Sequence, residues 1–410
     1  MRKKCRFCQH KLERTFVDLG MSPLANAYLK YEDLQAAESF YPLHTYVCHK
    51  CYLVQLEEFE SPEHIFGDYA YFSSFSKTWL KHVENYTKNI LEKFFINSDS
   101  LVVEVASNDG YLLQYFQAKN VPVLGIEPAA NVAKVAQEQG IDTIVKFFGC
   151  ATAQELTETG HQADLLIANN VLAHVPDIND FVGGMKIILK PTGLITIEFP
   201  HLLNLIIKNQ FDTIYHEHFS YFSLLTVETI FNHHELKIFD VEEIATHGGS
   251  LRIYACHQED VTKEISPRLE SLRKLEQEAD LDNLATYSLF GEQVRETKRK
   301  LLKFLIEVKE KGKSVVAYGA PAKGNTLLNY CGIRRDFIDF TVDISPHKQG
   351  LYLPGTHIPI KHPDTIKQTQ PDYVLILPWN IRDEIIQQMA YIKNWGGKFV
   401  VPIPEVEVLQ

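Results

Sequence analysis

Short apolar runs alternate with amphipathic stretches from residue 101 onward, and this pattern predicts most of the architecture. Apolar runs bounded by turn formers predict strands, whereas apolar positions three and four residues apart predict helices. The predicted strands are 101–106, 121–127, 141–145, 163–170, 193–200, 236–244 and 250–257, of which the last two are expected to pair. The helices predicted between them include 110–119, 129–139 and 180–190. Such alternation indicates a parallel sheet with helices on both faces.

A second, smaller α/β series follows a charged stretch at 261–312, whose pattern predicts long helices that bridge two domains. The strands predicted in this second series are 314–319, 337–343, 372–379 and 398–404. They predict a smaller doubly wound domain. We therefore expect three parts in the chain, at 1–70, 71–260 and 261–410.

The composition is that of an ordinary soluble globular protein, with 45% hydrophobic and 23% charged residues. The net charge of -11 argues against a broad electrostatic grip on nucleic acid or on an anionic membrane. This net charge is still compatible with a locally positive pocket that binds an anionic small ligand. The sequence shows no apolar run long enough to span a bilayer, and its basic N-terminus lacks the apolar core of a signal peptide. We expect a cytoplasmic protein.

Four cysteines form two C-x-x-C pairs, Cys5 with Cys8 and Cys48 with Cys51. Each pair can turn two thiolates onto one cation, so the two pairs together predict a tetrahedral structural zinc site. The alternatives are disulfides within the pairs, which a reducing compartment disfavours, or two unrelated redox pairs. The interval between the pairs is longer than in compact zinc ribbons, which predicts an excursion through "SPLANAYL" at 22–29.

Polar residues follow the strands of the larger predicted sheet, at the edge where open α/β sheets bind ligands. "SNDG" at 107–110 follows the first strand, Glu127 ends the second, and Asn169, Asn170 and His174 follow the fourth. Glu127 could accept both hydroxyls of a ribose there. The first loop is not G-x-G-x-x-G, which weakens the case for a nicotinamide cofactor. The structural alternatives are a solvated Glu127 and an ordinary hydrogen-bonded His174.

The stretch "IYHEHFSYFSLL" at 214–225 gathers two histidines, a glutamate and two tyrosines. Because buried polar groups are costly unless they are paired, this concentration calls for an explanation. It could be a metal site, an acid–base set or a polar turn before a helix from Ser223. A metal site needs a third ligand and an open coordination position. A helix cap needs only one such side chain.

In this order, the motifs resemble the zinc-containing C-methyltransferases of TDP-linked deoxysugar biosynthesis over nearly the whole length. The resemblance rests on the cysteine pairs, "SNDG" with "GIEP", "NVLAHVPD", "FDTIYHEHFSYFS", "HGGSLR", "YGAPAKGNT", "PGTHIPI" and "PDYVLILPWN". It implies an α/β protein with a zinc-binding N-terminal domain, a central class I methyltransferase domain and a smaller C-terminal Rossmann-like domain. The implied cofactors are S-adenosylmethionine and a structural Zn²⁺. The implied partner is a TDP-4-keto-6-deoxyhexose that is methylated at C3.

The resemblance also implies roles in the reaction. A methyl group can be added to carbon once a base removes the hydrogen beside a ketone and the enolate is stabilised. His218 matches the proposed base, and histidine suits this task because its pKa of about 6.5 lies near working pH. Glu217 would orient His218 and Tyr215 would hydrogen-bond the sugar, while Tyr69 and His174 match further active-site residues. The family uses no catalytic metal, so acid–base chemistry is the interpretation we favour.

Other contacts follow from the same resemblance. Ala106 stands where the methyltransferase motif often has glycine. The residues implied in cofactor binding are Glu104, Ala106, Asn108, Gly110, Glu127, Asn169 and Asn170. Those implied in substrate binding are His247, Arg252, Lys323 and Asn325. Lys323 lies in a small-residue loop between a strand and a helix, which suits a diphosphate. Arg252 could equally be a surface charge. His216 falls at a variable position and is given no role.

Two other functions are compatible with these residues. The first is methyl transfer to oxygen or nitrogen, in which the base would act on a hydroxyl or an amine. The second is a non-catalytic zinc-ribbon scaffold or nucleotide-sugar sensor built on a methyltransferase fold. The set of Tyr215, Glu217 and His218 argues against the second, since a binding module needs no base. We expect a monomer or a small homo-oligomer.

Overall fold

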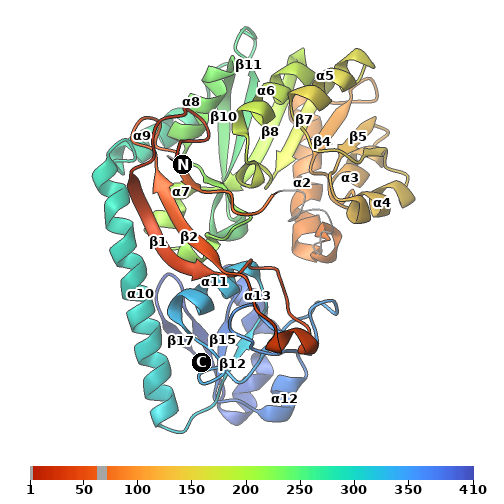
Figure 1. Ribbon diagram of the computed structural model, residues 1–410. Coiled ribbons are helices and arrows are strands. Elements are labelled where there is room, and N and C mark those ends of the chain that lie inside the picture. The colour runs from red at the N-terminus through yellow and green to blue at the C-terminus, as the bar shows by residue number, and fades with distance from the viewer. Residues whose placement is uncertain (1–2, 62–71) are drawn as a thin grey trace.

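The computed structural model describes residues 3–61 and 72–410, within which the strands form three sheets (Figure 1). The smallest is antiparallel, in the order β1–β2–β3–β9. It consists of β1 (Arg14–Ser22), β2 (Tyr41–Val47), β3 (Val54–Leu56) and β9 (Ser220–Tyr221). The last strand comes from the middle of the chain, so the N-terminal sheet is completed by a segment that directly follows the "YHEHF" motif.

The central sheet has seven strands in the order β10–β11–β8–β7–β4–β5–β6. Its strands are β4 (Val102–Val105), β5 (Val123–Ile126), β6 (Thr143–Ile144), β7 (Ala163–Asn169), β8 (Leu189–Pro200), β10 (Leu236–Ile244) and β11 (Ser250–His257). The strands from β8 to β6 run parallel, whereas β11 is antiparallel to both β8 and β10. The parallel strands read as apolar runs because both of their faces are buried.

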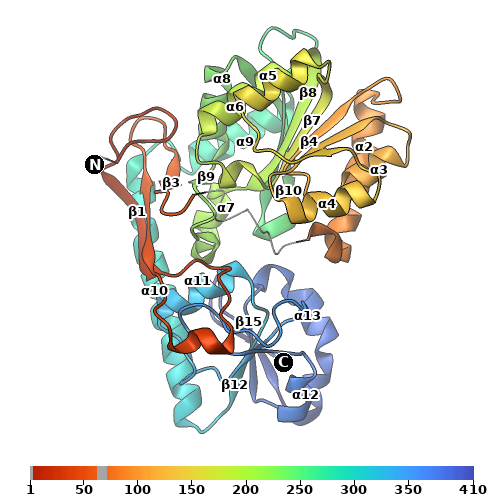
Figure 2. The ribbon, with the colours of Figure 1, turned by 45° about the vertical axis from the view of Figure 1, so that its right-hand side comes forward.

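Helices flank this sheet, as Figure 2 shows from a second direction. They are α2 (Lys77–Phe94), α3 (Leu113–Gln117), α4 (Ala130–Glu138), α5 (Cys150–Glu158), α6 (Ile178–Ile188) and α8 (Leu224–His233), whereas α7 (Leu202–Ile207) belongs to the core shared by the N-terminal sheet and the C-terminal domain. Polar side chains cap several of them. Asp177 accepts hydrogen bonds from the first backbone N–H groups of α6, and Ser223 does the same for α8. These caps fix where each helix begins.

The C-terminal sheet has the order β14–β13–β12–β15–β16–β17. It comprises β12 (Val315–Tyr318), β13 (Thr341–Val342), β14 (Ile360–Lys361), β15 (Tyr373–Ile376), β16 (Lys398–Val401) and β17 (Glu407–Leu409). Its helices are α11 (Ala322–Cys331), α12 (Thr365–Thr369) and α13 (Arg382–Gln388). Five of the six strands are parallel, and only β17 runs antiparallel to its neighbour.

Helix α9 (Pro267–Glu278) packs against β10 and α8, and α10 (Leu284–Glu310) runs from the upper to the lower half of Figure 1. Helix α10 buries a stripe that includes Tyr287, Phe290 and Val294. Phe290 stacks on Phe16 of β1 with ring centroids 4.6 Å apart, so α10 also supports the N-terminal sheet. An amphipathic helix of this length gains most of its stability from such packing.

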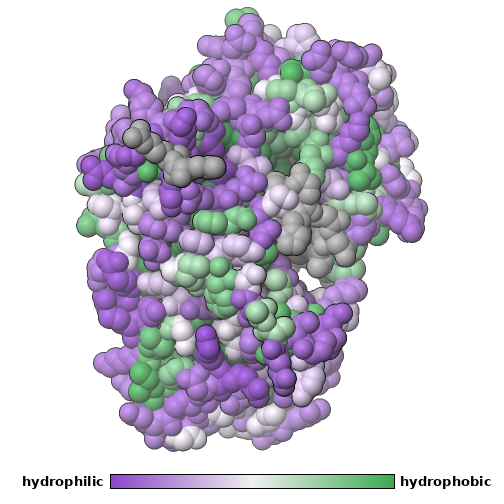
Figure 3. Space-filling model, in the orientation of Figure 1, coloured by the Kyte–Doolittle hydropathy of each residue, from purple (hydrophilic) through white to green (hydrophobic). Residues whose placement is uncertain are grey.

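The predicted α/β class and the two sheets of the larger domains are confirmed. Strands β10 and β11 have the predicted bounds and pair as expected, and helices α9 and α10 lie within 261–312. Strands β1, β2 and β3 of the N-terminal sheet were not predicted, and neither were β9, β14 and β17. The face shown in Figure 3 is mostly hydrophilic with scattered hydrophobic patches. No helix among the described residues is long and apolar enough to cross a membrane.

Candidate active site and zinc centre

The two cysteine pairs meet in one cluster beside the N-terminal sheet. All four sulfur atoms lie within 4.8 Å of one another, with Cys5 Sγ 3.6 Å from Cys51 Sγ and Cys8 Sγ 3.5 Å from Cys48 Sγ. Tetrahedral Zn–S bonds of about 2.3 Å place sulfurs roughly 3.8 Å apart, so the cluster fits a zinc ion. In residues 3–61 and 72–410 it is the one group of three or more potential ligands with this proximity. Four thiolates leave no open position, so the site is structural.

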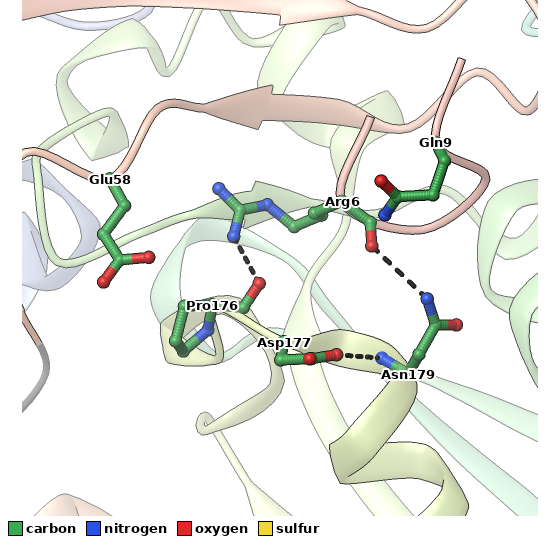
Figure 4. A pocket seen from close by; sticks show the side chains of 6 residues that line it. All are labelled: Arg6, Gln9, Glu58, Pro176, Asp177 and Asn179. Carbon is green, nitrogen blue, oxygen red and sulfur yellow. Dashed lines mark hydrogen bonds between the residues drawn. The ribbon is translucent and has the colours of Figure 1, made fainter. Parts of the chain in front are cut away.

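The residues between Cys5 and Cys8 contact the segment that follows His174, and Figure 4 shows Arg6 beside Pro176 and Asn179. Arg6 Nη1 donates to the Pro176 carbonyl at 2.6 Å, and Asn179 Nδ2 donates to the Phe7 carbonyl at 3.0 Å. An open pocket of about 440 Å³ lies here, lined by Arg6, Gln9, Glu58, Pro176, Asp177 and Asn179. The zinc centre thereby braces the turn between η3 (Leu172–His174) and α6.

The loop after β4 has an unusual backbone. Ala106 and Asn108 adopt φ values of 56° and 51°, in the left-handed region that residues other than glycine rarely occupy. Gly110 has φ 78°, and a Cβ there would lie 2.4 Å from the Ile141 side chain. Glycine is therefore required at position 110 for two reasons. The Asn108 side chain is already used, because its Oδ1 accepts the Ser73 N–H at 2.9 Å.

Glu127, at the end of β5, closes this loop. Its carboxylate accepts the backbone N–H of Asn108 at 2.9 Å and that of Ala129 at 2.8 Å. Burial raises its pKa, and the two N–H donors partly oppose that shift. Behind the loop, burial raises the pKa of Glu104 well above its usual range, a hydrogen bond from Tyr111 opposes the shift, and Glu127 and Asp109 add to it. The loop is thus an acidic environment.

Two asparagines face the same sheet edge from the end of β7, which lies next to β4. The Asn169 side chain is 7% exposed, and neither of its amide atoms has a hydrogen-bond partner among the described residues. Asn170 has φ 55°, and its side-chain oxygen also lacks a partner within 3–61 and 72–410. Buried amides are normally paired, so these groups suit contact with a bound ligand.

His218 lies between the central and C-terminal domains with a defined tautomer. Its Nδ1 is 2.8 Å from the Thr213 carbonyl oxygen, which can only accept, so Nδ1 carries the proton. Nε2 is then left with its lone pair. Burial lowers the pKa of His218 well below its usual value, and positive charge on His174, His247 or Lys323 would lower it further. The ring is therefore neutral and can accept a proton at Nε2.

Two predicted residues pack on this ring. The Tyr215 ring centroid is 4.0 Å from that of His218, and the His174 centroid is 4.7 Å away in an edge-on contact. Burial lowers the pKa of His174 to about 4, although a hydrogen bond to the Glu217 backbone opposes the shift. The structure therefore brings together side chains from η3 and from the "YHEHF" motif, as the sequence suggested.

His218 Nδ1 and Glu217 Oε1 form hydrogen bonds with different partners. The Thr213 carbonyl accepts from His218 Nδ1 and so orients the imidazole, whereas Glu217 Oε1 accepts a hydrogen bond from Asn26 Nδ2 at 2.6 Å. Burial raises the pKa of Glu217 to about 7, while Asn26 and Lys348 act in the opposite direction. A role for Glu217 in the reaction stays a prediction.

Lys323, in the first turn of α11, lies near enough to His218 for its charge to lower the pKa of that histidine. Its Nζ donates to Asn380 Oδ1 at 2.8 Å and lies 4.6 Å from the centre of the Trp379 ring. Burial lowers its pKa, while the nearby Asp212 carboxylate opposes the shift. Burial likewise raises the pKa of Asp212 to about 7, and Trp379 Nε1 donates to this carboxylate at 2.7 Å. Sequence reasoning missed Asp212 and Trp379, although both stand in quoted motifs.

The other predicted substrate residues have different surroundings. Arg252 Nε donates to the fully buried Glu198 at 2.8 Å, and its Nη1 donates to Glu242 at 2.8 Å. Arg252 is therefore not a surface charge, and these pairs occupy its guanidinium. Asn325 is 1% exposed and donates to the Ala25 carbonyl at 2.6 Å. For both residues, contact with a substrate stays a prediction.

Three histidine and tyrosine positions complete the comparison with the sequence. His247 is exposed, has φ 55°, and packs against Trp79 with ring centroids 5.6 Å apart. His216, which was given no role, is 4% exposed and packs edge-on against Tyr41. Tyr69 lies outside the described residues, so its predicted role stays a prediction.

Comparisons with known proteins cover all three parts of the chain. A zinc binding domain model matches residues 5–66, a methyltransferase domain model matches 79–241, and a C-methyltransferase C-terminal domain model matches 245–404. The C-methyltransferase NovU of Streptomyces niveus is 36% identical over 99% of this chain and 96% of its own length. A ubiquinone biosynthesis O-methyltransferase of Bradyrhizobium is 29% identical over 26% of this chain and 44% of its own length.

Similar solved structures match less than half of the chain. Protein PH0226 of Pyrococcus horikoshii aligns with 48% of it at 14% identity and a TM-score of 0.38. Magnesium protoporphyrin IX methyltransferase of Synechocystis, solved with bound S-adenosylmethionine, aligns with 48% at 13% identity and a TM-score of 0.34. They cover 99% and 88% of those two chains, respectively. At these scores, neither likeness bears on the reaction.

Proposed function

Since this chain belongs to the family of S-adenosylmethionine-dependent C-methyltransferases, we propose that it methylates C3 of a TDP-linked 4-keto-6-deoxy sugar through an enolate. The base is His218. The observation that carries the proposal is the hydrogen bond of 2.8 Å between His218 Nδ1 and the Thr213 carbonyl. This bond leaves Nε2 as the proton acceptor of a neutral imidazole at the junction of the two α/β domains.

The cofactor lies at the edge formed by β4, β5 and β7. Bound S-adenosylmethionine supplies an electrophilic methyl group on a cationic sulfur. Glu127 accepts the ribose hydroxyls in addition to its two backbone donors, since a carboxylate offers about four lone-pair sites. Glu104 and the unpaired amide of Asn169 favour the charged amino acid part of the cofactor. The acidic loop suits a cationic ligand.

The sugar nucleotide binds on the C-terminal domain, across from the cofactor edge formed by β4, β5 and β7. The loop 319–321 leads from β12 into α11, whose first turn has backbone N–H groups without partners inside the helix. Lys323 adds a cation there, and Lys348 donates to the Ala320 carbonyl at 2.9 Å in the same loop. Helix N-termini and ammonium groups both favour a diphosphate. The nucleoside diphosphate therefore binds to the C-terminal domain, while its sugar reaches His218.

The reaction balances with these groups. His218 Nε2 takes the C3 proton, and the electron pair of the C–H bond moves toward the C4 carbonyl oxygen. Positive charge on Lys323 and hydrogen bonding by Tyr215 favour the resulting negative charge. A C–C bond forms to the methyl carbon as its bond to sulfur breaks, which gives the branched sugar and S-adenosylhomocysteine. The proton on His218 then leaves to water.

The test is mass spectrometry and NMR of a panel of TDP-4-keto-6-deoxyhexoses incubated with S-adenosylmethionine. We expect a mass gain of one methylene, with the new methyl carbon bonded to C3. The matched panel lacking the 4-keto group should stay unmodified, because its C3 hydrogen is not acidic. A methyl group on oxygen or nitrogen would overturn the proposal, and so would equal turnover of both panels.

A further inference from the structure

The excursion between the two cysteine pairs is not explained by zinc binding. Residues 22–29 leave the end of β1 and reach the C-terminal domain, where Leu29 and Tyr352 exchange two backbone hydrogen bonds of 2.8–3.0 Å. On the way, the Tyr28 hydroxyl donates to the Ala320 carbonyl at 2.6 Å. The excursion therefore lies against the loop that follows β12, well away from the cysteine cluster.

One residue of the excursion also reaches the central domain. Asn26 Nδ2 donates to Glu217 Oε1 at 2.6 Å, across 191 positions of sequence. Asn26 itself is exposed, whereas Glu217 is 7% exposed, so the hydrogen bond joins an exposed amide to a buried carboxylate. A short hydrogen bond to a carboxylate at such a place holds one rotamer of the carboxylate and favours its ionised form.

Among the described residues, two titratable groups act on Glu217 besides the Asn26 amide. Tyr28 stands on the excursion with Asn26, and Lys348 stands on the loop after β13. Lys348 Nζ lies 5.2 Å from the centre of the Tyr28 ring and donates to the Ala320 carbonyl at 2.9 Å. The N-terminal and C-terminal domains thus jointly set the surroundings of a carboxylate that belongs to the central domain.

We propose that Asn26 is a positioning residue, which holds the Glu217 carboxylate in place to accept a hydroxyl hydrogen bond from the bound sugar. This inference rests on the proposed function, because the sugar and the role of Glu217 come from it. The substrate site is then built from all three domains. The excursion explains why the two cysteine pairs are so far apart in sequence: the intervening chain forms a wall of the sugar site.

Asn26→Ala tests the inference through the pH dependence of kcat/KM. Burial raises the pKa of Glu217 to about 7 and the Asn26 donor opposes that shift. Loss of the donor should therefore raise this pKa, and the acidic limb of kcat/KM should move to higher pH by about one unit. At pH 7 the variant should be about 5- to 10-fold slower and should recover above pH 8.5. Asn26→Gln, which keeps the amide, should restore part of the difference.

Tyr28→Phe is the matched comparison, because it removes the hydroxyl that donates to the Ala320 carbonyl and lies 3.3 Å from Asn26 Oδ1, but keeps the Asn26 amide that donates to Glu217. Its acidic limb should move less than that of Asn26→Ala. A second readout needs no turnover: the Glu217 carboxyl signal in ¹³C NMR, assigned with Glu217→Gln, should titrate at higher pH in Asn26→Ala. The affinity for S-adenosylmethionine should be the same in all of these variants.

Two results would overturn the inference while leaving the proposed function intact. One is a normal C3-methylated product with an acidic limb that Asn26→Ala does not move. The other is an equal displacement of the limb in Tyr28→Phe, which would mean that the excursion acts only through folding. A panel in which no keto sugar gains a methyl group would instead overturn the proposed function itself.

Discussion

The two α/β domains use the same hydrogen-bond pattern where their first two strands end. In the central domain, Glu127 accepts the N–H of Asn108 from the first loop and that of Ala129 two residues ahead. In the C-terminal domain, Asp343 accepts the N–H of Ala320 at 2.7 Å and that of Ser345 at 2.8 Å. In both cases a carboxylate after the second strand fixes the loop after the first.

The difference lies in the charges around each loop. Glu104 and Asp109 stand beside Glu127, so the central loop is acidic. Lys323 and Lys348 stand beside the C-terminal loop, which is therefore locally positive. The comparison teaches that the shared backbone offers a place for a ligand, while the flanking side chains select its charge. A cationic sulfonium suits the first loop and an anionic diphosphate suits the second.

The sharpest way to break this comparison is to disable the base that lies between the two loops. His218→Asn should lower kcat by about 10²–10⁴-fold, the usual contribution of general-base catalysis. Calorimetry should show nearly unchanged affinity for both ligands, because each is held by its own loop. Tyr215→Phe is the control and should lose less, since the base is still present. A His218→Asn enzyme with near wild-type turnover would exclude this residue as the base.

Glu127→Ala should affect one loop only. Loss of the ribose contacts should weaken S-adenosylmethionine binding by about 1.5–3 kcal/mol, the range for hydrogen bonds to a charged group. The affinity for TDP should be unchanged in the same calorimetric experiment. Asp343→Ala is the matched variant in the other domain and should leave the S-adenosylmethionine affinity at its wild-type value. The comparison fails if either variant weakens both ligands equally.

Lys323→Met should sharpen the comparison from the other side. The ammonium group is partly neutralised by Asp212, so its removal should raise the Kd for TDP by about 10-fold, toward the low end for a charged hydrogen bond. The affinity for TDP should also depend less on salt concentration, because one cation fewer interacts with the diphosphate. Methionine keeps the contact with the Trp379 ring, which limits any loss of packing. An unchanged Kd would mean that the diphosphate binds elsewhere.

The smallest effect concerns the backbone of the central loop. Ala106 has φ 56°, which costs a residue with a Cβ about 1–2 kcal/mol. Glycine avoids this cost but gains freedom in the unfolded chain, so Ala106→Gly should stabilise the protein by roughly 0.5 kcal/mol. Thermal unfolding should then shift upward by about 1–2 °C. Gly332→Ala, at φ 74°, is the control and should shift the other way.

Local patterns predicted what local physics determines. Residues 236–244 and 250–257 form strands with the predicted bounds, because two apolar runs pair in an antiparallel register with one irregularity between Ile238 and Asp240. The two cysteine pairs predicted their own cluster, since the chemistry of zinc requires four thiolates together. His174 and His218 meet as the motif order suggested. In each case a few residues are enough to predict the feature.

Local sequence patterns did not predict the contacts between distant segments. Strand β9 has two residues, which is too short for any period, and it forms only because β3 offers it an edge. The orientation of Glu217 depends on Asn26, and that of His218 depends on a backbone carbonyl. Arg252 is held by Glu198 across neighbouring strands. These choices depend on how three domains pack, which the sequence of any one segment does not contain.

The most direct test of the central claim is hydrogen exchange at C3 of the sugar. The wild-type enzyme is incubated in heavy water with the TDP-4-keto-6-deoxyhexose and S-adenosylhomocysteine, so that the proton can leave but no methyl group can be transferred. Proton NMR should show loss of the C3 hydrogen signal at a rate well above that of the enzyme-free control, because the His218 base removes it. A C3 signal that persists at the control rate, with both ligands bound, would contradict the account.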